Sequence, residues 1–318
     1  MKSASPTRGV LTLAYGHPRF IEQARDLGLS LQLHAPHLPR ALVTDSKDAE
    51  LLSIFTEIIP LNPDFGSGVR QKLHLDHYSC YDETLFIDSD CLVLGNLDAF
   101  WAAFQGACFG VPGWRFIHWG DSDPYMDVNY ILERFGVTAL PKFNGGTYYF
   151  TRTPEARQFF DTARRLMNDW QGLRLNPFRS NGPNDEAVYS IAMAVHRLRP
   201  TDMGSGGMWT PCGYRGRLVM DAIAGMCSFE KEGKVRTPEV VHFPGEYIYC
   251  FQYNRERARI RKRVLGRRPP TVPLARAYLV SALWQLSRKS EGLSRLARNA
   301  LRGWRATARS LHARRDNA

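Results

Sequence analysis

The segment TLFIDSDCLVLGNLD, residues 84–98, decides the expected fold. Its first four residues have the composition of a buried strand, and the strand ends at the carboxylates of Asp88 and Asp90. Open α/β sheets bind ligands at the carboxyl ends of their strands. Residues i and i+2 of an extended chain point the same way, so both carboxylates can face one divalent cation, and oxygen ligands suit Mn²⁺ or Mg²⁺ better than zinc. A solvated turn after a strand would use the same residues, so the pattern alone does not decide between the two.

The rest of the chain alternates apolar runs with helical spacing, which predicts an α/β fold built on a mostly parallel sheet flanked by helices. We expect strands at 10–14, 41–44, 58–59, 84–87 and 147–150, helices at 20–33, 51–55, 72–81, 154–170 and 186–196, and two closing strands, 226–230 and 240–243, around a turn at 232–233. Residues 101–140 are rich in aromatic residues and turn formers, which indicates an irregular binding surface more than a core.

The charge is distributed unevenly along the 318 residues. The chain has 42 basic and 31 acidic residues, but 18 basic and only 3 acidic ones lie in 255–318. The remaining 24 basic and 28 acidic residues make 1–254 mildly acidic, which argues against a nucleic-acid-binding protein as a whole. We therefore expect a catalytic domain over 1–254 and a basic helical extension over 255–318.

The extension begins with a basic run, 255–268, expected to be a linker or surface anchor, and ends in an amphipathic pattern. At 100° per residue, the apolar and the arginine positions lie roughly 160° apart. The apolar positions are Leu293, Leu296, Ala300, Trp304, Ala308 and Leu311, and the basic ones are Arg295, Arg298, Arg302, Arg305 and Arg309. Such a helix fits an anionic membrane surface, and a helix docked on the protein's own body or bound to nucleic acid are the alternatives.

Other features bear on the compartment. The first residues carry no apolar stretch after their charges, and the longest apolar segment, 277–286, is about half of a membrane span. The six cysteines form no C-x-x-C pair and are too sparse for a disulfide scaffold. We expect a cytoplasmic protein, with peripheral attachment to the inner face of the membrane through its extension.

Several segments together resemble one enzyme family. Residues 84–98 closely resemble the metal-binding segment of the GT-A retaining glycosyltransferases of the glycogenin and galactosyltransferase type, glycosyltransferase family 8. Five further segments resemble that family's motifs in the same order: LTLAY (11–15), KLH (72–74), FNGG (143–146), GPND (182–185) and VVHFPG (240–245). The resemblance covers about Val10 to Gly245. It implies a Rossmann-like GT-A fold and metal-dependent transfer of a sugar from a nucleotide-sugar, typically UDP-linked, to a glycan, glycolipid or other acceptor.

The resemblance also implies roles for individual residues. It makes Asp88, Asp90 and His242 the ligands of Mn²⁺, with Mg²⁺ as the second choice, and Asn144 and Asp185 the catalytic residues. The implied nucleotide-sugar contacts are Thr12, Ala14, Tyr15, Lys72, Asp88, Ser89, Asn144, Gly145, Gly146, Asp185 and Gly245. A divalent cation and Lys72 would stabilise the charge of the departing diphosphate. Asp185 would act as a nucleophile or as a stabiliser of positive charge on the sugar ring, and it also suits the N-cap of the following helix.

The chain departs from the family pattern at two positions. Residues 242–249, HFPGEYIY, lack the family's phosphate-contacting lysine, so Lys72, Arg70 or the extension would have to supply that charge. Glu186 stands where a glutamine often follows the aspartate. Two other functions compete with glycosyl transfer: a sugar nucleotidyltransferase, which wants a glycine-rich phosphate loop after the first strand, and a GT-A binding protein that has lost catalysis.

Overall fold

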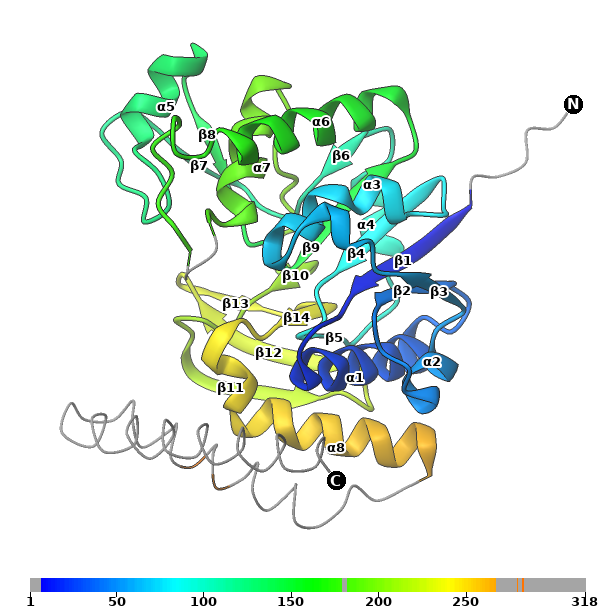
Figure 1. Cartoon of the computed structure of the whole chain (residues 1–318). Coiled ribbons are helices and arrows are strands. Elements are labelled where there is room, and N and C mark those ends of the chain that lie inside the picture. Colours follow the sequence, from blue (N-terminus) through cyan, green and yellow to red (C-terminus); the bar gives the residue numbers. More distant parts are fainter. Residues whose placement is uncertain (1–6, 179–181, 267–278, 280–281, 283–318) are drawn as a thin grey trace, which may run out of the picture.

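The computed structural model describes residues 7–178, 182–266, 279 and 282 of the chain. A six-stranded sheet in the order β3-β2-β1-β4-β9-β6 forms its centre (Figure 1). Its strands are β1 (Arg8–Leu13), β2 (Arg40–Thr44), β3 (Glu57–Pro60), β4 (Glu83–Ile87), β6 (Phe109–Gly110) and β9 (Thr147–Thr151). The first four in space are parallel, and β9 runs antiparallel to β4 and β6. The expected mixed, mostly parallel sheet is confirmed.

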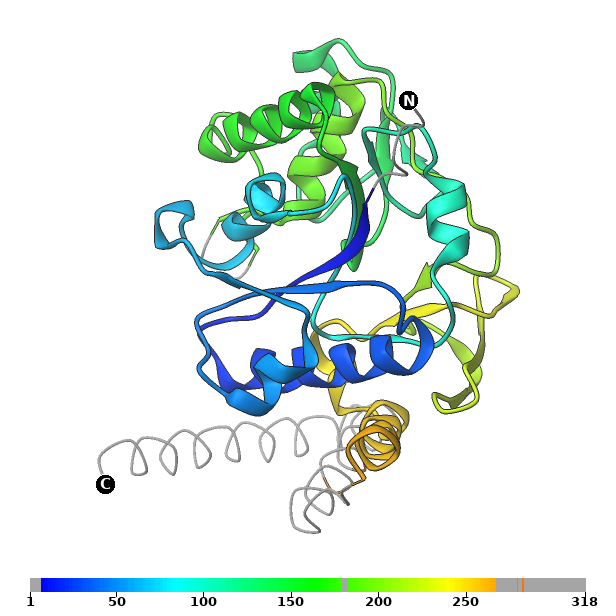
Figure 2. The same ribbon diagram turned by 90° about the vertical axis from the view of Figure 1, so that its right-hand side faces the viewer.

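Helices cover both faces of this sheet, because successive strand residues alternate between two cores. Leu11 and Phe86 face α6 (Pro154–Asn168) and α7 (Asp185–Val195), whereas Val10 and Leu85 face α1 (Pro18–His34) and α4 (Asp98–Ala103). Figure 2 shows the green α6 and α7 on one side of β1 and the blue α1 and α2 (Ala49–Ile54) on the other. Helix α5 (Val128–Phe135) also packs in the core that α6 and α7 cover.

Three smaller sheets complete the body. Strands β5 (Cys91–Val93), β14 (Val240–His242) and β10 (Met208–Trp209) form one, and β7 (Arg115–Ile117) pairs with β8 (Leu140–Lys142) in another. The third contains β11 (Arg215–Asp221), β12 (Met226–Lys231) and β13 (Lys234–Arg236). The two strands expected around residues 232–233 were 226–230 and 240–243, and the pairing of the second was wrong. Strand β12 turns back into β13 at this position, while β14 pairs with β5.

Two other expectations need correction. The helix expected over 72–81 is a 3₁₀ helix, η2 (Gly68–His74), continued by one turn of α-helix, α3 (Leu75–Tyr78). The segment 101–140 is less irregular than expected, since it holds the end of α4, all of α5, the short strands β6 and β7 and the first residue of β8, and Trp101 is buried in the core. Two further 3₁₀ helices, η1 (Pro63–Phe65) and η3 (Gly245–Tyr249), are short connections.

The basic run after Asn254 is not a linker, because α8 (Phe251–Leu265) passes through this position and packs along α1. Arg257 and Arg261 of α8 both pair with Asp26 of α1, whose side chain is fully buried. Burial alone would raise the pKa of Asp26, but the two arginines outweigh it and lower the pKa, so this carboxylate stays ionised. The helix is therefore part of the folded body.

The amphipathic positions expected between Leu293 and Leu311 lie outside the described residues. Among the helices of the described chain, none combines the length and the apolar character needed to cross a membrane. Among the described residues, Cys80, Cys91, Cys108 and Cys227 form no disulfide.

Candidate active site

Three separate segments meet where β4 ends. The Asp88 amide donates to the Gly146 carbonyl at 2.9 Å, and the Phe243 amide donates to the Asp90 carbonyl at 3.1 Å. Three of the motifs read from the sequence, 88–90, 143–146 and 240–245, thus lie side by side through main-chain hydrogen bonds. This is the carboxyl edge of the parallel strands, as expected.

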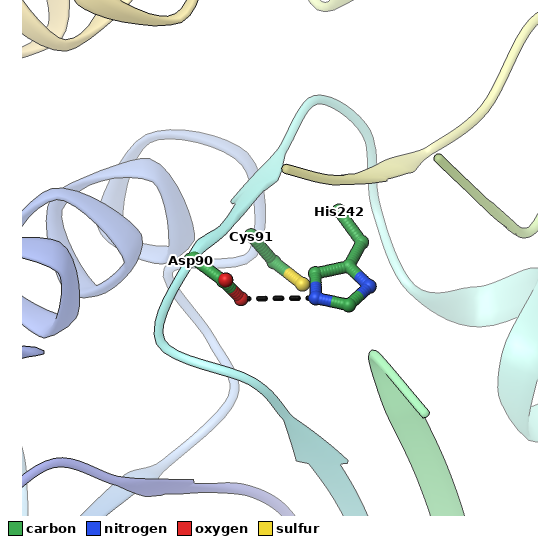
Figure 3. A group of neighbouring side chains, drawn as sticks. All are labelled: Asp90, Cys91 and His242. Carbon is green, nitrogen blue, oxygen red and sulfur yellow. Dashed lines mark ion pairs between the residues drawn. The ribbon is translucent and has the colours of Figure 1, made fainter. Parts of the chain in front are cut away.

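His242 is held from both sides of its ring. Its Nε2 lies 3.0 Å from Oδ1 of Asp90, and its Nδ1 lies 2.5 Å from Oδ1 of Asn144. Figure 3 shows the imidazole and the Asp90 carboxylate pointing toward one another across β5 and β14. Burial by itself would lower the pKa of His242, but the Asp90 carboxylate raises it above the ordinary value.

Lys72 lies between the carboxylates of Asp88 and Asp185. Its Nζ lies 2.6 Å from Oδ2 of Asp88 and 3.4 Å from Oδ2 of Asp185. The Tyr148 hydroxyl donates to the same oxygen of Asp185 at 2.8 Å, and the Tyr189 hydroxyl donates to the Lys72 carbonyl at 2.7 Å. Although burial would lower the pKa of Lys72, Asp185 and Asp88 raise it, so the site contains a fixed ammonium charge.

The turn before β9 needs glycine at both positions. A methyl group at Gly146 would lie 2.6 Å from Nδ1 of His242, and one at Gly145 would lie 2.5 Å from the Tyr148 hydroxyl. The Glu186 carboxylate accepts a hydrogen bond of 2.9 Å from the Gly145 amide, so Glu186 holds this turn against α7. This role was not predicted, because the sequence shows only that a carboxylate replaces an amide there.

The start of α7 clarifies Asp185. The N-cap is Asn184, whose side-chain oxygen accepts the Glu186 amide at 2.8 Å. Asp185 is therefore the first helical residue, and its carboxylate points to Lys72 and Tyr148 instead of capping the helix. The N-cap alternative for Asp185 is wrong.

The other expected contact residues lie in or just after β1, in the turn between β4 and β5, and at the start of η3. Thr12 and Ser89 are buried, and the Ala14 amide donates to the Val43 carbonyl as β1 ends. The Tyr15 hydroxyl donates to the Gly68 carbonyl at 3.1 Å, which joins the first loop to η2. Gly245 begins η3 with a φ of 62°, in the left-handed region that glycine favours.

A metal ion fits the donor set. Asp90, Cys91 and His242 are the one group of three His, Cys, Asp or Glu side chains, in the part of the chain described, whose ligand atoms all lie within 4.8 Å of one another. A carboxylate oxygen and an imidazole nitrogen are both common ligands of divalent metal ions. Cys91 is fully buried in the core, and burial raises the pKa of its thiol, so it suits a packing role better than a metal-ligating one. Asp88, the third expected ligand, forms an ion pair with Lys72, so its carboxylate would have to bind both Lys72 and the metal ion.

The missing lysine of the 242–249 segment has a partial substitute. Lys72 is in the site, whereas Arg70 extends to the side-chain oxygen of Asn168 at 3.4 Å, away from the carboxylates. Of these two cations, only Lys72 therefore lies among the carboxylates of the site.

Comparisons with known proteins support the fold. No family model matches the chain, and no curated protein matches it. Among solved structures, the bifunctional glycosyltransferase WbbM has a TM-score of 0.53 at 10% identity, over 86% of this chain and 52% of that one. The galactosyltransferase LgtC with donor and acceptor sugar analogs scores 0.48 at 12% identity, over 74% and 87%, and mouse xyloside xylosyltransferase 1 scores 0.42 at 12% identity, over 65% and 88%. This chain thus spans about half of the WbbM chain, and it has the GT-A glycosyltransferase fold.

Proposed function

We propose that this protein is a metal-dependent retaining glycosyltransferase, which moves a sugar from a UDP-sugar to a glycan or lipid-linked acceptor. The observation that carries the proposal is the convergence of Asp88, Asp90, His242, Lys72 and Asp185 at one strand edge of a GT-A fold. Mn²⁺ held by Asp90, His242 and Asp88 would neutralise the donor diphosphate when bound.

Lys72 would assist the departure of the diphosphate. Its ammonium is held by two carboxylates and its main chain by Tyr189, so the charge is positioned before the donor binds. As the bond between the sugar C1 and the phosphate oxygen breaks, the electron pair leaves with the diphosphate, where a prearranged cation stabilises it.

Asp185 would stabilise the positive charge that develops on the sugar ring. Its carboxylate is shared by the Lys72 ammonium and the Tyr148 hydroxyl, both of which lower its nucleophilicity. This favours an electrostatic role beside the developing positive charge over covalent attack. The acceptor oxygen then bonds to C1 from the same face, and its proton passes to the departing phosphate oxygen.

The test offers the full-length protein a panel of UDP-, GDP- and ADP-sugars with Mn²⁺ and measures nucleotide release. Donor hydrolysis needs no knowledge of the acceptor. Asp90→Asn should abolish both Mn²⁺-dependent nucleotide binding and release, and Asp185→Ala should reduce turnover far more than donor affinity. Asp64→Asn, which changes an exposed carboxylate on η1, is the control. Wild-type turnover in Asp90→Asn would refute the metal assignment, and nucleotide binding without any release would indicate a binding protein that has lost catalysis.

A further inference from the structure

Two tryptophans and an arginine form a rigid stack outside the centre just described. The rings of Trp114 and Trp209 have centroids 5.0 Å apart, and the guanidinium of Arg236 lies 3.8 Å from the Trp209 centroid and 5.2 Å from that of Trp114. Arg236 is buried and donates to the carbonyls of Lys231 and Gly204, each at 3.3 Å. Trp209 is 7% exposed, but Trp114 is 39% exposed. An indole held by a fixed arginine therefore offers part of its surface to solvent.

Positive charge surrounds this indole. Arg115 follows it in the chain, and its side chain is 62% exposed, with Glu232 at 3.9 Å. Arg236 reaches the same carboxylate at 3.6 Å. Arg199 is exposed, and its guanidinium lies 5.1 Å from the Phe116 centroid. Arg115 and Arg236 thus share the one carboxylate of Glu232, and Arg199 adds a further positive charge.

The stack lies next to the catalytic centre along two strands. Trp209 on β10 pairs with Val241 on β14, directly before His242. Trp114 precedes β7, which pairs with β8, and β8 ends two residues before Asn144. Trp209 and Val241 share the face of β14 opposite to His242, so the placement rests on the segment before Trp114. A Cβ atom added to Gly113 would lie 3.4 Å from Cβ of Phe143 and 3.6 Å from the Lys142 carbonyl oxygen, which places this segment beside the turn that carries Asn144.

We propose that Trp114, Arg115 and Arg199 form an acceptor subsite for a glycan whose pyranose carries a negative charge, a carboxylate or a phosphate. The inference rests on the proposed glycosyltransferase function and names the substrate class. The apolar C–H face of a pyranose packs on an indole, and guanidinium groups pair with carboxylate or phosphate. The fixed Arg236 behind the indole keeps the ring in position, so little conformational entropy is lost on binding.

Calorimetry on the full-length protein, with and without UDP and Mn²⁺, tests this. Methyl glucuronide and glucose 6-phosphate are the anionic probes, and methyl glucoside is the neutral one. We expect the better anionic probe to bind about tenfold more tightly than the neutral sugar, with added salt reducing the difference. The two anionic probes show which of the two groups, carboxylate or phosphate, is recognised.

Trp114→Ala should weaken binding of the anionic probe about tenfold, Trp114→Phe should restore part of it, and Arg199→Gln should remove the preference for the charged sugar. Phe251→Ala on α8, where the side chain is 37% exposed, is the matched control and should bind normally. Donor hydrolysis by Phe251→Ala should equal that of the wild-type protein.

The inference is overturned if the neutral and anionic sugars bind equally, or if Trp114→Ala, with an unchanged melting temperature, binds like the control. Failure of the proposed function looks different, because wild-type protein would then hydrolyse no donor while still preferring the anionic sugar.

Discussion

Gly146→Ala tests how tightly the imidazole of His242 is positioned. The added methyl group would lie 2.6 Å from Nδ1 and 2.7 Å from Cγ of the ring, closer than non-bonded atoms approach. The φ of Gly146 lies outside the left-handed region, so alanine strains no backbone and the whole effect comes from this contact. The ring cannot move without lengthening its contact to Asp90 or to Asn144.

Overpacking of this kind costs about 1–3 kcal/mol. Because the displaced group is a proposed metal ligand, we expect the cost to appear in Mn²⁺ affinity, as a loss of about 5- to 150-fold, and in nucleotide-sugar hydrolysis at subsaturating Mn²⁺.

Calorimetric titration measures the loss of Mn²⁺ affinity, and urea unfolding measures the loss of folding stability. Gly95→Ala is the control, since its methyl group would lie 3.2 Å from Cγ of Glu239, an aliphatic carbon of a flexible side chain. Equal Mn²⁺ affinity in Gly146→Ala, Gly95→Ala and wild type would refute the reasoning that His242 is a positioned ligand.

Three other outcomes follow from the described contacts. Tyr148→Phe removes the 2.8 Å hydrogen bond to Asp185 and should lower kcat about tenfold with little change in donor KM, as steady-state kinetics would show; unchanged kcat contradicts it. A chain ending at Asn254 leaves Asp26 buried without its arginines and should lose about 3–5 kcal/mol in urea unfolding, whereas a chain that retains all of α8 should keep its stability and still hydrolyse donor. Burial lowers the pKa of His74 to about 4, so the unfolded chain takes up a proton that the folded chain does not, and stability should fall as pH drops from about 6.5 to 4; a His74→Gln variant with the same slope would disprove this.

The sequence predicts β1, β2, β4 and β9 of the central sheet well, because these strands are buried on both faces. Such strands appear as short apolar runs, and runs such as 41–44 and 84–87 correspond closely to β2 and β4. The small sheets were harder to predict. β14 carries a similar run, but nothing local to it shows that it pairs with β5 and so brings His242 to Asp90.

Motif reasoning identified the members of the site but not their pairing. Asp88 and Asp90, two residues apart, were expected to face one cation. In the structure Asp88 pairs with Lys72, and Asp90 pairs with His242. Local sequence cannot distinguish these arrangements, because the partners come from η2 and β14, which are distant in the chain.

The basic extension shows how charge counting can mislead. A run of arginines after Asn254 suggests a solvated or membrane-facing segment, but two of them neutralise Asp26, which occupies the buried side of α1. The signal was present in α1, where a carboxylate stands between the buried Ala24 and Leu27 and requires a cation from elsewhere. An excess of charge at one end of a chain is therefore evidence of an exposed surface only after every buried opposite charge in the body has been assigned a partner.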